Sequence, residues 1–431
     1  MRFLIVLLSL LGFAVGGEIY AVLVAGSNGY FNYRHQADVC HAYHMLTNHN
    51  VKPENIITFV FDDIAQNYLN PFKGKLFNQP DGQDVYAGVP FDYTGYDVTP
   101  ENFLAVLTGD AKGVKGGNGR VLKSTNKDKV FIYYADHGAP SLLAFPYDVM
   151  TVRDLNSALQ SMYDKKMYNE LVFYMEACFS GSMFENVLPK NLSILAVTSA
   201  NAVEESWACY CDIPNFEHTC LSDYFTTSWL QDSDSKDLSK ETLQSQYTII
   251  KTKTNVSNVL QFGDLSISKE VVANFQGHSK SRSSSNSRHQ PENFERWSSR
   301  EVPLKSLESQ LKRASDPVKR VKLARELELM KMKRKYLDEH THELVSKLIS
   351  DVATREQVIT NTPTKIEQLE CHDRVVKTYS TECFNLGQNS YALNAVGPLA
   401  NLCELGMPTD RIVQAIKSHC ATKNVHMHDI I

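Results

Sequence analysis

The chain has 431 residues, of which 43% are hydrophobic, 22% charged and 10% aromatic, and its formal net charge is −5. This composition excludes a disordered chain, a fibrous protein and a bundle of membrane helices. The length predicts two or more domains.

The first segment, residues 1–17, is predicted to be a signal peptide. Met1 and Arg2 form a short charged start, Phe3–Val15 is an almost unbroken apolar run, and small residues follow it. The run is too short for a membrane-spanning helix, although a single-pass anchor is the alternative interpretation. We therefore expect a protein of the secretory pathway without a membrane anchor, in an oxidising or lysosomal compartment.

Residues 18–276 predict an α/β domain. Short apolar runs bounded by polar residues or glycine indicate strands buried on both faces, as in a parallel sheet covered by helices. These runs are Ile19–Ala25, Ile56–Phe61, Val130–Tyr134, Leu171–Met175 and Ile194–Thr198. Helical patterns lie between them at His35–Leu46, Pro100–Leu107 and Val152–Met162. Residues 65–98 are rich in Gly, Pro and Asn and predict a surface excursion.

Two of the predicted strands end in residues that can carry chemistry. The third runs into Asp136, His137 and Gly138, and the fourth into Glu176 and Cys178. The carboxyl ends of neighbouring parallel strands meet at one edge, so the imidazole and the thiol can face one another. Such a pair supplies the nucleophile and the proton donor of acyl transfer, with backbone N–H groups of Gly138 and Cys178 for the oxyanion. The alternative for an isolated cysteine is a small buried hydrophobic residue.

The rest of the chain changes character. Residues 277–302 are polar and low in complexity and predict a flexible, protease-sensitive linker. Residues 303–431 have helical periodicity and predict an all-α domain, with apolar faces at Leu323, Leu327, Met330 and Leu337 and at Leu344, Leu348 and Val352. Residues 303–336 hold eleven Lys and Arg against four Asp and Glu, a net +7 that leaves −12 for the remaining chain. We interpret this segment as one that docks on its own acidic domain rather than on nucleic acid.

Nine cysteines fit an oxidising compartment, and the odd number leaves at least one unpaired. Cys211 and Cys220 are close enough to close a small loop, which leaves Cys40, Cys178 and Cys209 as candidate free thiols. The four cysteines near the C-terminus, Cys371, Cys383, Cys403 and Cys420, permit three pairings. A zinc site is the competing interpretation, but their spacings are far from C-x-x-C.

Several longer motifs give the chain a family resemblance. They are Val24–Tyr30, Asn32–Asp38, Asp62-Asp63, Asp136-His137-Gly138, Glu176-Ala177-Cys178, Glu205-Ser206-Trp207 and Asp223-Tyr224. Together they resemble the legumain family, the asparaginyl endopeptidases, over essentially the whole chain after the signal peptide and more weakly in the linker. The resemblance implies a caspase-like α/β fold followed by a helical prodomain.

The resemblance also implies roles for individual residues. Cys178 would be the nucleophile, His137 the general acid/base, and Asn32 the residue that orients the imidazole. The specificity pocket would consist of Arg34, His35, Glu176, Ser206 and Asp223. An asparagine amide has an acceptor oxygen for a guanidinium and N–H donors for carboxylates, so this pocket fits it. Aspartate fits only when it is protonated, which predicts cleavage after Asp at acidic pH alone.

For the prodomain, the resemblance favours disulfides Cys371–Cys403 and Cys383–Cys420. It further implies that the prodomain caps the active site and that acid releases it after self-cleavage in the linker, at Asn286 or Asn293. Asp316 lies where some relatives are processed, but Pro317 follows it. Asp136 is either structural or, as in relatives, prone to succinimide formation.

The expected partners are protein and peptide substrates with accessible Asn, the chain's own prodomain and cystatin-type inhibitors. No nucleic acid, cofactor or metal is expected. Asn191 and Asn255 begin Asn-X-Ser glycosylation motifs. The expected location is a lysosome, an acidic vacuole, or a gut lumen or other extracellular space. The alternatives are a peptide asparaginyl ligase on the same site, a lipid-anchor transamidase, which we disfavour because residues 426–431 are not a membrane segment, and an inactive relative that only binds.

Overall fold

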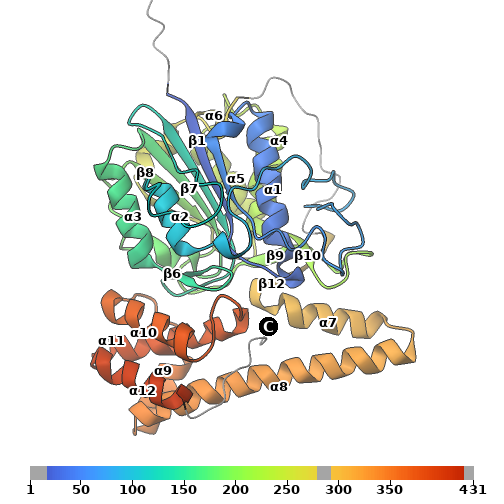
Figure 1. The fold of residues 1–431 in the computed structure, drawn as a ribbon, viewed down its shortest axis with the longest axis vertical. Coiled ribbons are helices and arrows are strands. Elements are labelled where there is room, and N and C mark those ends of the chain that lie inside the picture. The colour runs from blue at the N-terminus through green and yellow to red at the C-terminus, as the bar shows by residue number, and fades with distance from the viewer. Residues whose placement is uncertain (1–16, 279–292, 422–431) are drawn as a thin grey trace, which may run out of the picture.

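The computed structural model describes residues 17–278 and 293–421. Figure 1 shows an α/β body with a helical domain against one end of it. Nearly all of the predicted signal peptide, the candidate processing residue Asn286 and residues 422–431 lie outside the described residues. Within the described ranges, no helix combines the length and the apolar character needed to cross a bilayer.

The body is built on a central sheet of six strands in the order β11-β8-β7-β3-β1-β2. All neighbours in it are parallel except β11 and β8. The strands are β1 (Ile19–Ala25), β2 (Ile56–Phe59), β3 (Lys129–Ala135), β7 (Glu170–Glu176), β8 (Ile194–Thr198) and β11 (Leu260–Gly263). The five strands predicted from apolar runs are the five parallel ones, which confirms the predicted α/β class.

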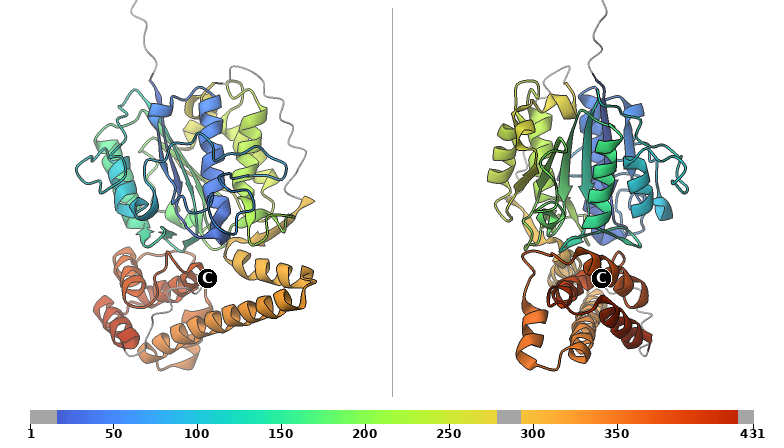
Figure 2. Two further views of the ribbon diagram at one scale, coloured as in Figure 1. Left: turned by 45° about the vertical axis from the view of Figure 1, so that its right-hand side comes forward. Right: turned by 90° about the vertical axis from the view of Figure 1, so that its left-hand side faces the viewer.

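Helices cover both faces of this sheet, which is why its strands are apolar on both sides. The helices of the body are α1 (Tyr33–Asn48), α2 (Pro100–Leu107), α3 (Val152–Asp164), α4 (Tyr224–Ser235), α5 (Leu243–Lys253) and α6 (Ala273–Gln276). Val22 and Ile132 pack with α2 and α3 on one face, whereas Leu23 and Tyr133 pack with α1, α4 and α5 on the other. Figure 2 shows the sheet edge-on between its helices.

Two small sheets lie at the end of the body that faces the helical domain. One contains β4 (Gly138–Ala139), β5 (Leu142–Ala144) and β6 (Val149–Thr151), and the other contains β9 (Trp207–Cys211), β10 (Cys220–Asp223) and β12 (Glu295–Ser298). The prediction did not find these strands, because runs of two to five residues carry little periodicity.

Strand β12 corrects the predicted linker, which extended to residue 302. Residues 295–298 pair antiparallel with β9, and the 3₁₀ helix η7 (Ser299–Glu301) follows. Trp297 is buried against Ala208, Val302 and the Cys211–Cys220 disulfide, so this stretch is held by packing rather than free. Regular structure is therefore present well before the predicted start of the prodomain.

The helical domain consists of α7 (Val302–Arg313), α8 (Pro317–Leu348), α9 (Val352–Thr360), α10 (Leu369–Glu382), α11 (Val396–Glu404) and α12 (Thr409–Ala421). Asp316 caps α8 by accepting from the N–H groups of Val318 and Lys319, with Pro317 at the first helical position. Disulfides Cys371–Cys403 and Cys383–Cys420 join α10 to α11 and α12 around an apolar core, and Cys40, Cys178 and Cys209 are free and buried.

The basic segment docks on the body through few of its charges. Figure 1 shows α7 lying between α8 and the body. Ion pairs reach the body from Arg313 to Asp212, at 2.7 Å, and from Lys319 to Glu217, at 3.1 Å. Lys322 and Lys335 are both 76% exposed at the side chain and pair within α8 itself. The predicted docking on carboxylates therefore describes a small part of this segment, because most of its charge lies on the outer helix.

Candidate active site

Cys178 lies just beyond the carboxyl end of β7. Phe179, directly after it, has a φ of 57°, a left-handed conformation that turns the chain from the strand into the 3₁₀ helix η4 (Ser180–Met183). This turn leaves Cys178 at the tip. Its Sγ accepts from the N–H of Ser206 at 3.3 Å and is fully buried. Burial raises the pKa of Cys178 to about 11, so the thiol is neutral in this form of the protein.

His137 lies beyond the end of the neighbouring strand β3, and Asn32 fixes its ring. The Asn32 Nδ2 donates to the Asn28 carbonyl at 2.9 Å, so its Oδ1 is the atom that faces the imidazole. His137 Nε2 therefore donates to that Oδ1 at 2.8 Å, and its Nδ1 is left as the proton acceptor. Nδ1 is buried and has no hydrogen-bond partner among the described residues. Burial lowers the pKa of His137, and the charges of Arg34 and Arg300 add to this.

The two strand ends approach closely because Gly138 has no side chain. A Cβ at this position would lie 2.3 Å from the Cys178 carbonyl oxygen, so any other residue would push the turns apart. The Asp136 N–H donates to the Glu176 carbonyl at 3.1 Å and continues the β3–β7 pairing into the site. The His137 and Cys178 turns are thereby held side by side, as the strand order predicted.

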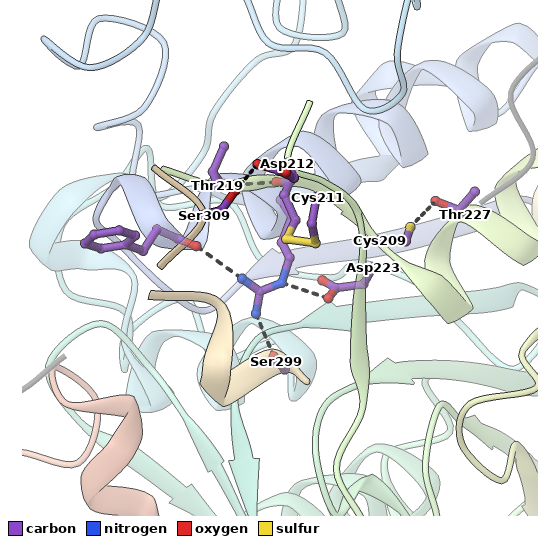
Figure 3. Close-up of a disulfide and its surroundings, with 11 residues drawn as sticks. Cys209, Cys211, Asp212, Thr219, Asp223, Thr227, Ser299 and Ser309 are labelled. Carbon is purple, nitrogen blue, oxygen red and sulfur yellow. Dashed lines mark hydrogen bonds and ion pairs between the residues drawn. A yellow bond between two sulfur atoms is a disulfide. The ribbon is translucent and has the colours of Figure 1, made fainter. Parts of the chain in front are cut away.

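Arg34 forms the centre of the candidate specificity pocket. The side chain is fully buried, and its Nε donates to Asp223 Oδ1 at 2.8 Å. Nη1 donates to the Phe31 carbonyl at 3.2 Å, and Nη2 donates to Ser299 Oγ at 2.6 Å. Figure 3 shows Asp223 and Ser299 reaching this guanidinium from different elements. The Ser299 hydroxyl, on the segment that leads into the helical domain, therefore occupies the Nη2 donor of Arg34.

Carboxyl groups and a histidine complete the pocket. Glu176 and Asp223 are buried, and burial raises the pKa of each, with Arg34 opposing the rise. His35 contacts Ser27 Oγ through Nδ1 at 2.6 Å, and its Nε2 lies 3.5 Å from Asp223 Oδ2. Its ring also lies 5.2 Å from that of His137, edge to face. The pocket and the catalytic pair are therefore one contiguous buried cluster.

The segment after the linker covers this cluster. The Ser299 N–H donates to the Ser206 carbonyl at 3.0 Å, which extends the β12–β9 pairing past the nucleophile. The next residue, Arg300, donates to the Gly138 carbonyl at 2.5 Å, and its guanidinium lies 5.1 Å from the centre of the Phe179 ring. A peptide substrate could not reach Cys178 while this strand is in place.

Two groups of described side chains have potential metal ligands close together. His35, Asp136 and His137 form the first, but the imidazoles already contact Ser27 and Asn32. The second contains His340 with Cys383 and Cys420, whose sulfurs are joined in a disulfide and are not thiolate ligands. Neither group has the donor set of a ready metal site.

The remaining candidate residues lie at the surface. Asn191 and Asn255 are exposed, as a glycosylation site requires, and Asn293, shortly before β12, is exposed as well. Asp316, which caps α8, is also exposed. Sequence reasoning missed Ser299 and Arg300 as residues of the site, since they fell inside the predicted linker. It also gave no role to Asp38, which lies in a quoted motif but carries no signal of its burial.

Comparisons with known proteins match both the α/β body and the helical domain. Residues 19–278 match the Peptidase C13 family, and residues 325–420 match the legumain prodomain. The chain belongs to the legumain family. It is a cysteine endopeptidase with a legumain-type prodomain.

Individual legumain relatives cover both domains. Legumain of Mus musculus is 44% identical over 408 residues, which span 94% of this chain and 93% of that protein. Hemoglobinase of Schistosoma mansoni is 42% identical over 402 residues, spanning 93% and 91%. The vacuolar-processing enzyme delta-isozyme of Arabidopsis thaliana is 40% identical over 441 residues, spanning 94% and 91%. A structure of caspase-1 from Spodoptera frugiperda is 10% identical with a TM-score of 0.38, covering 62% of this chain and 92% of that one, a likeness too low to argue from.

Proposed function

We propose that this protein is the zymogen of an endopeptidase that cleaves after asparagine and is activated by acid. The observation that carries the proposal is the buried guanidinium of Arg34, flanked by the carboxyl group of Asp223 beside the Cys178 turn. A site built of buried polar groups rejects side chains that cannot pair with them, since each unpaired group costs about 1–3 kcal/mol.

The pocket chemistry matches a carboxamide. The Arg34 Nη2 atom, which now donates to Ser299, would donate to the amide oxygen of asparagine. Glu176 and Asp223 would accept from the amide nitrogen, and Ser206 and His35 would complete the walls. An ionised aspartate would bring a negative charge to the same carboxyl groups, so only its protonated form would bind. Cleavage after Asp is therefore expected at acidic pH.

Catalysis follows once the covering strand has left. Cys178 Sγ attacks the carbonyl carbon of the scissile bond and gives its proton to Nδ1 of His137. Backbone N–H groups of Gly138 and Cys178 hold the oxyanion. His137 then protonates the leaving amine as the C–N bond breaks, which leaves a thioester on Cys178. Water attacks this thioester, with His137 taking its proton, and releases the acid product together with the thiol.

Acid activation is supported by charged groups between the prodomain and the body. Lys377 on α10 pairs with Asp154 on α3 at 2.9 Å, and Thr151 donates to Asp373 at 2.6 Å. Partial burial of Asp373 acts to raise its pKa, but hydrogen bonds from Lys377 and Thr151 outweigh this effect and lower the pKa. A lowered carboxyl pKa gives stability that is present above the unfolded pKa and lost as the pH falls through the folded one. These contacts therefore weaken in acid.

The setting of the enzyme is part of the same proposal. An acidic lysosome or vacuole, or an acidic extracellular space such as a gut lumen, would supply the activating pH. Cleavage at Asn286 or Asn293 would free the prodomain, Asn191 and Asn255 would carry glycans, and cystatin-type proteins would inhibit the mature form.

The test uses purified proprotein moved from neutral to acidic pH beside a Cys178→Ala control. Chain length is followed by mass spectrometry, and hydrolysis is followed with reporter peptides that end in Asn or Gln. We expect the wild type to cut itself between the domains and then to cleave the Asn peptide alone. An intact, inert chain that behaves like its control would contradict catalysis, and equal cleavage of the Gln peptide would contradict the pocket. A second peptide that begins with glycine is added as an amine acceptor. Ligation joins it to the reporter and hydrolysis does not, so the product mass distinguishes the two reactions.

A further inference from the structure

Asp38 is a buried acid directly behind the candidate pocket. It lies on α1 one turn after Arg34, so both side chains leave the same face of the helix. Its side chain has no exposed surface and does not belong to the residues that would touch an asparagine side chain. A buried acid must be either paired with a cation or protonated, because an isolated charge in the interior is very costly.

The contacts of Asp38 aim it at Asp223. Its Oδ1 accepts from Ser222 Oγ and from Asn78 Nδ2, each at 2.6 Å. Ser222 in turn accepts from Thr227 Oγ1 at 2.7 Å, which orients the serine hydroxyl toward Asp38. These donors occupy one carboxyl oxygen and leave the other, Oδ2, buried without a donor among the described residues. Ser222, which binds Asp38, directly precedes Asp223 on β10.

A hydrogen bond between the two carboxyl groups acts to raise the pKa of Asp38 and to lower that of Asp223. Neither Oδ2 atom has an N–H or O–H donor elsewhere in the described chain, although His35 Nε2 lies 3.5 Å from that of Asp223. Two carboxylates in contact cannot both be ionised, so one proton must lie between them. Arg34 donates to Asp223 Oδ1, which favours the charge on Asp223 and the proton on Asp38.

The other titratable groups around Asp38 do not offer it a compensating positive charge. They are Tyr133 on β3, Cys209 on β9 and Glu176 on β7, together with Arg34, His35 and His41 on its own helix and Asp223 on β10. His41 has a raised pKa, but it pairs with Asp234 and is linked to Asp38 only through Asn78. Burial raises the pKa of Tyr133 and Cys209, which therefore stay neutral, and lowers that of His35. The guanidinium is already paired with Asp223. Burial likewise raises the pKa of Asp38.

We propose that Asp38 is a positioning residue of the asparagine pocket, which keeps its proton and donates it to Asp223. The donated hydrogen bond holds the Asp223 carboxylate toward Arg34 and leaves the Arg34–Asp223 pair without net charge, as a neutral carboxamide requires. Loss of the proton would place a second negative charge behind Asp223 and disturb the pair. This inference rests on the proposed asparagine specificity and names a further residue that sets it.

The first test compares Asp38→Asn with Asp38→Ala in the activated enzyme. Asparagine reproduces the protonated acid, since it accepts at Oδ1 and donates at Nδ2, whereas alanine leaves Asp223 without its donor. We expect Asp38→Asn to keep the KM for an Asn reporter within about threefold of the wild type, and Asp38→Ala to raise it about tenfold or more. The kcat of each variant should stay within about threefold of the wild type, because Asp38 does not touch the reacting atoms.

The pH profile gives a readout that a purely structural role would not move. The wild-type KM should rise with pH as the shared proton is lost, and the KM of Asp38→Asn should stay flat over the same range. Asp92→Asn is the matched control, because Asp92 is buried but binds Thr58 and Arg120 outside the pocket. The KM of Asp92→Asn should depend on pH in the same way as that of the wild type. A tenfold rise in KM for Asp38→Asn, or a wild-type pH profile in that variant, would overturn the proposal.

The second test does not need activity and uses the intact Cys178→Ala zymogen. The infrared difference spectrum between this protein and its Asp38→Asn variant should contain the C=O band of a protonated carboxyl group at neutral pH. Carboxylate bands in its place would overturn the proposal, even if Asp38→Ala failed to fold. If the wild type cannot cleave the Asn reporter, the proposed specificity fails, whereas the infrared result still decides whether Asp38 holds the proton.

Discussion

The buried carboxyl groups of the catalytic domain contrast with a buried histidine of the prodomain. The interior of the catalytic domain contains the carboxyl groups of Asp38, Asp136 and Glu176, and burial raises the pKa of each. The prodomain buries the imidazole of His372 on α10, against Pro140 of the catalytic domain, and burial lowers its pKa to about 4. The catalytic domain therefore buries acids together with His35 and His137, and the prodomain buries a base at its contact with the catalytic domain.

This difference gives the carboxyl groups and His372 opposite responses to pH. A carboxyl group with a raised pKa stabilises the fold fully below its unfolded pKa of ~4, and this stability is lost as the pH rises through the folded value. A histidine with a lowered pKa stabilises the fold above its unfolded pKa of ~6.5, and this stability is lost as the pH falls toward about 4. At these carboxyl groups acid stabilises the catalytic domain, although His35 and His137 act in the opposite sense there, and at His372 it destabilises the docked prodomain. The proposed acid switch would therefore involve both interiors.

The largest expected effect is this opposition itself. In full-length Cys178→Ala, which cannot cut itself, acidification should increase hydrogen-exchange protection in β3 and β7 and decrease it in α10. The measurement is exchange followed by mass spectrometry, corrected for the pH dependence of intrinsic exchange rates. Protection that moves in the same direction in both domains would break the comparison.

Next in size is the contact that crosses the active site. Arg300→Ala removes hydrogen bonds to the Gly138 carbonyl and to Asn394, together with the contact with Phe179. We expect the uncut variant to hydrolyse an Asn reporter at neutral pH about tenfold faster or more than the uncut wild type.

Arg296→Ala, on the same segment, is the matched control for this variant. Arg296 contacts Asn255 and Tyr224 rather than the catalytic turns. The uncut control should stay as inactive as the wild type. If Arg300→Ala stayed as inactive as this control, the inhibition would be assigned to the pairing of β12 alone.

A smaller effect is expected at the buried histidine. Glutamine at position 372 keeps a polar group near Pro140 but cannot take a proton, so His372→Gln should retain about 2 kcal/mol of prodomain docking at pH ~5 that the wild type loses. Activity should consequently appear at lower pH than in the wild type. His342→Gln, an exposed change on α8, should leave the activation midpoint where it is. An unchanged midpoint in both variants would remove His372 from the switch.

The smallest effect concerns the basic segment. Lys319 and Glu217 are 48% and 43% exposed at the side chain, so their ion pair is screened by water. Lys319→Ala should change the free energy of unfolding, measured in urea, by no more than about 0.5 kcal/mol. A larger loss would mean that charge pairing, rather than the strand and the two interiors, holds the prodomain.

How far the sequence predicts this molecule depends on the range of the interactions involved. The strands β1, β3 and β7 follow from continuous apolar runs, and the His137 and Cys178 turns follow from the rule that parallel strands end at a common edge. The pocket residues Arg34 and Asp223 came from family resemblance, since the 189 positions between them leave no local signal.

The features that the sequence did not predict depend on burial by residues far away along the chain. Strand β12 has one large apolar residue, Trp297, and forms because the edge of β9 is available to it. Asp38 is an unremarkable helix residue in sequence, and only the packing of β10 against α1 turns it into a buried acid beside another. Neither feature can be read from composition or periodicity.

The pairing of β12 with β9 means that a substrate peptide adding to this edge would compete with the chain's own segment for the same place in the sheet. An extended peptide can add to the edge of β9 through backbone hydrogen bonds, whatever its side chains, as the chain's own Glu295–Ser298 does. Before cleavage this competitor is tethered and its effective concentration is high. The three disulfides each lie within one domain, so a cut before β12 leaves the prodomain held without covalent bonds. From that moment inhibition becomes bimolecular, and simple dilution favours the active enzyme.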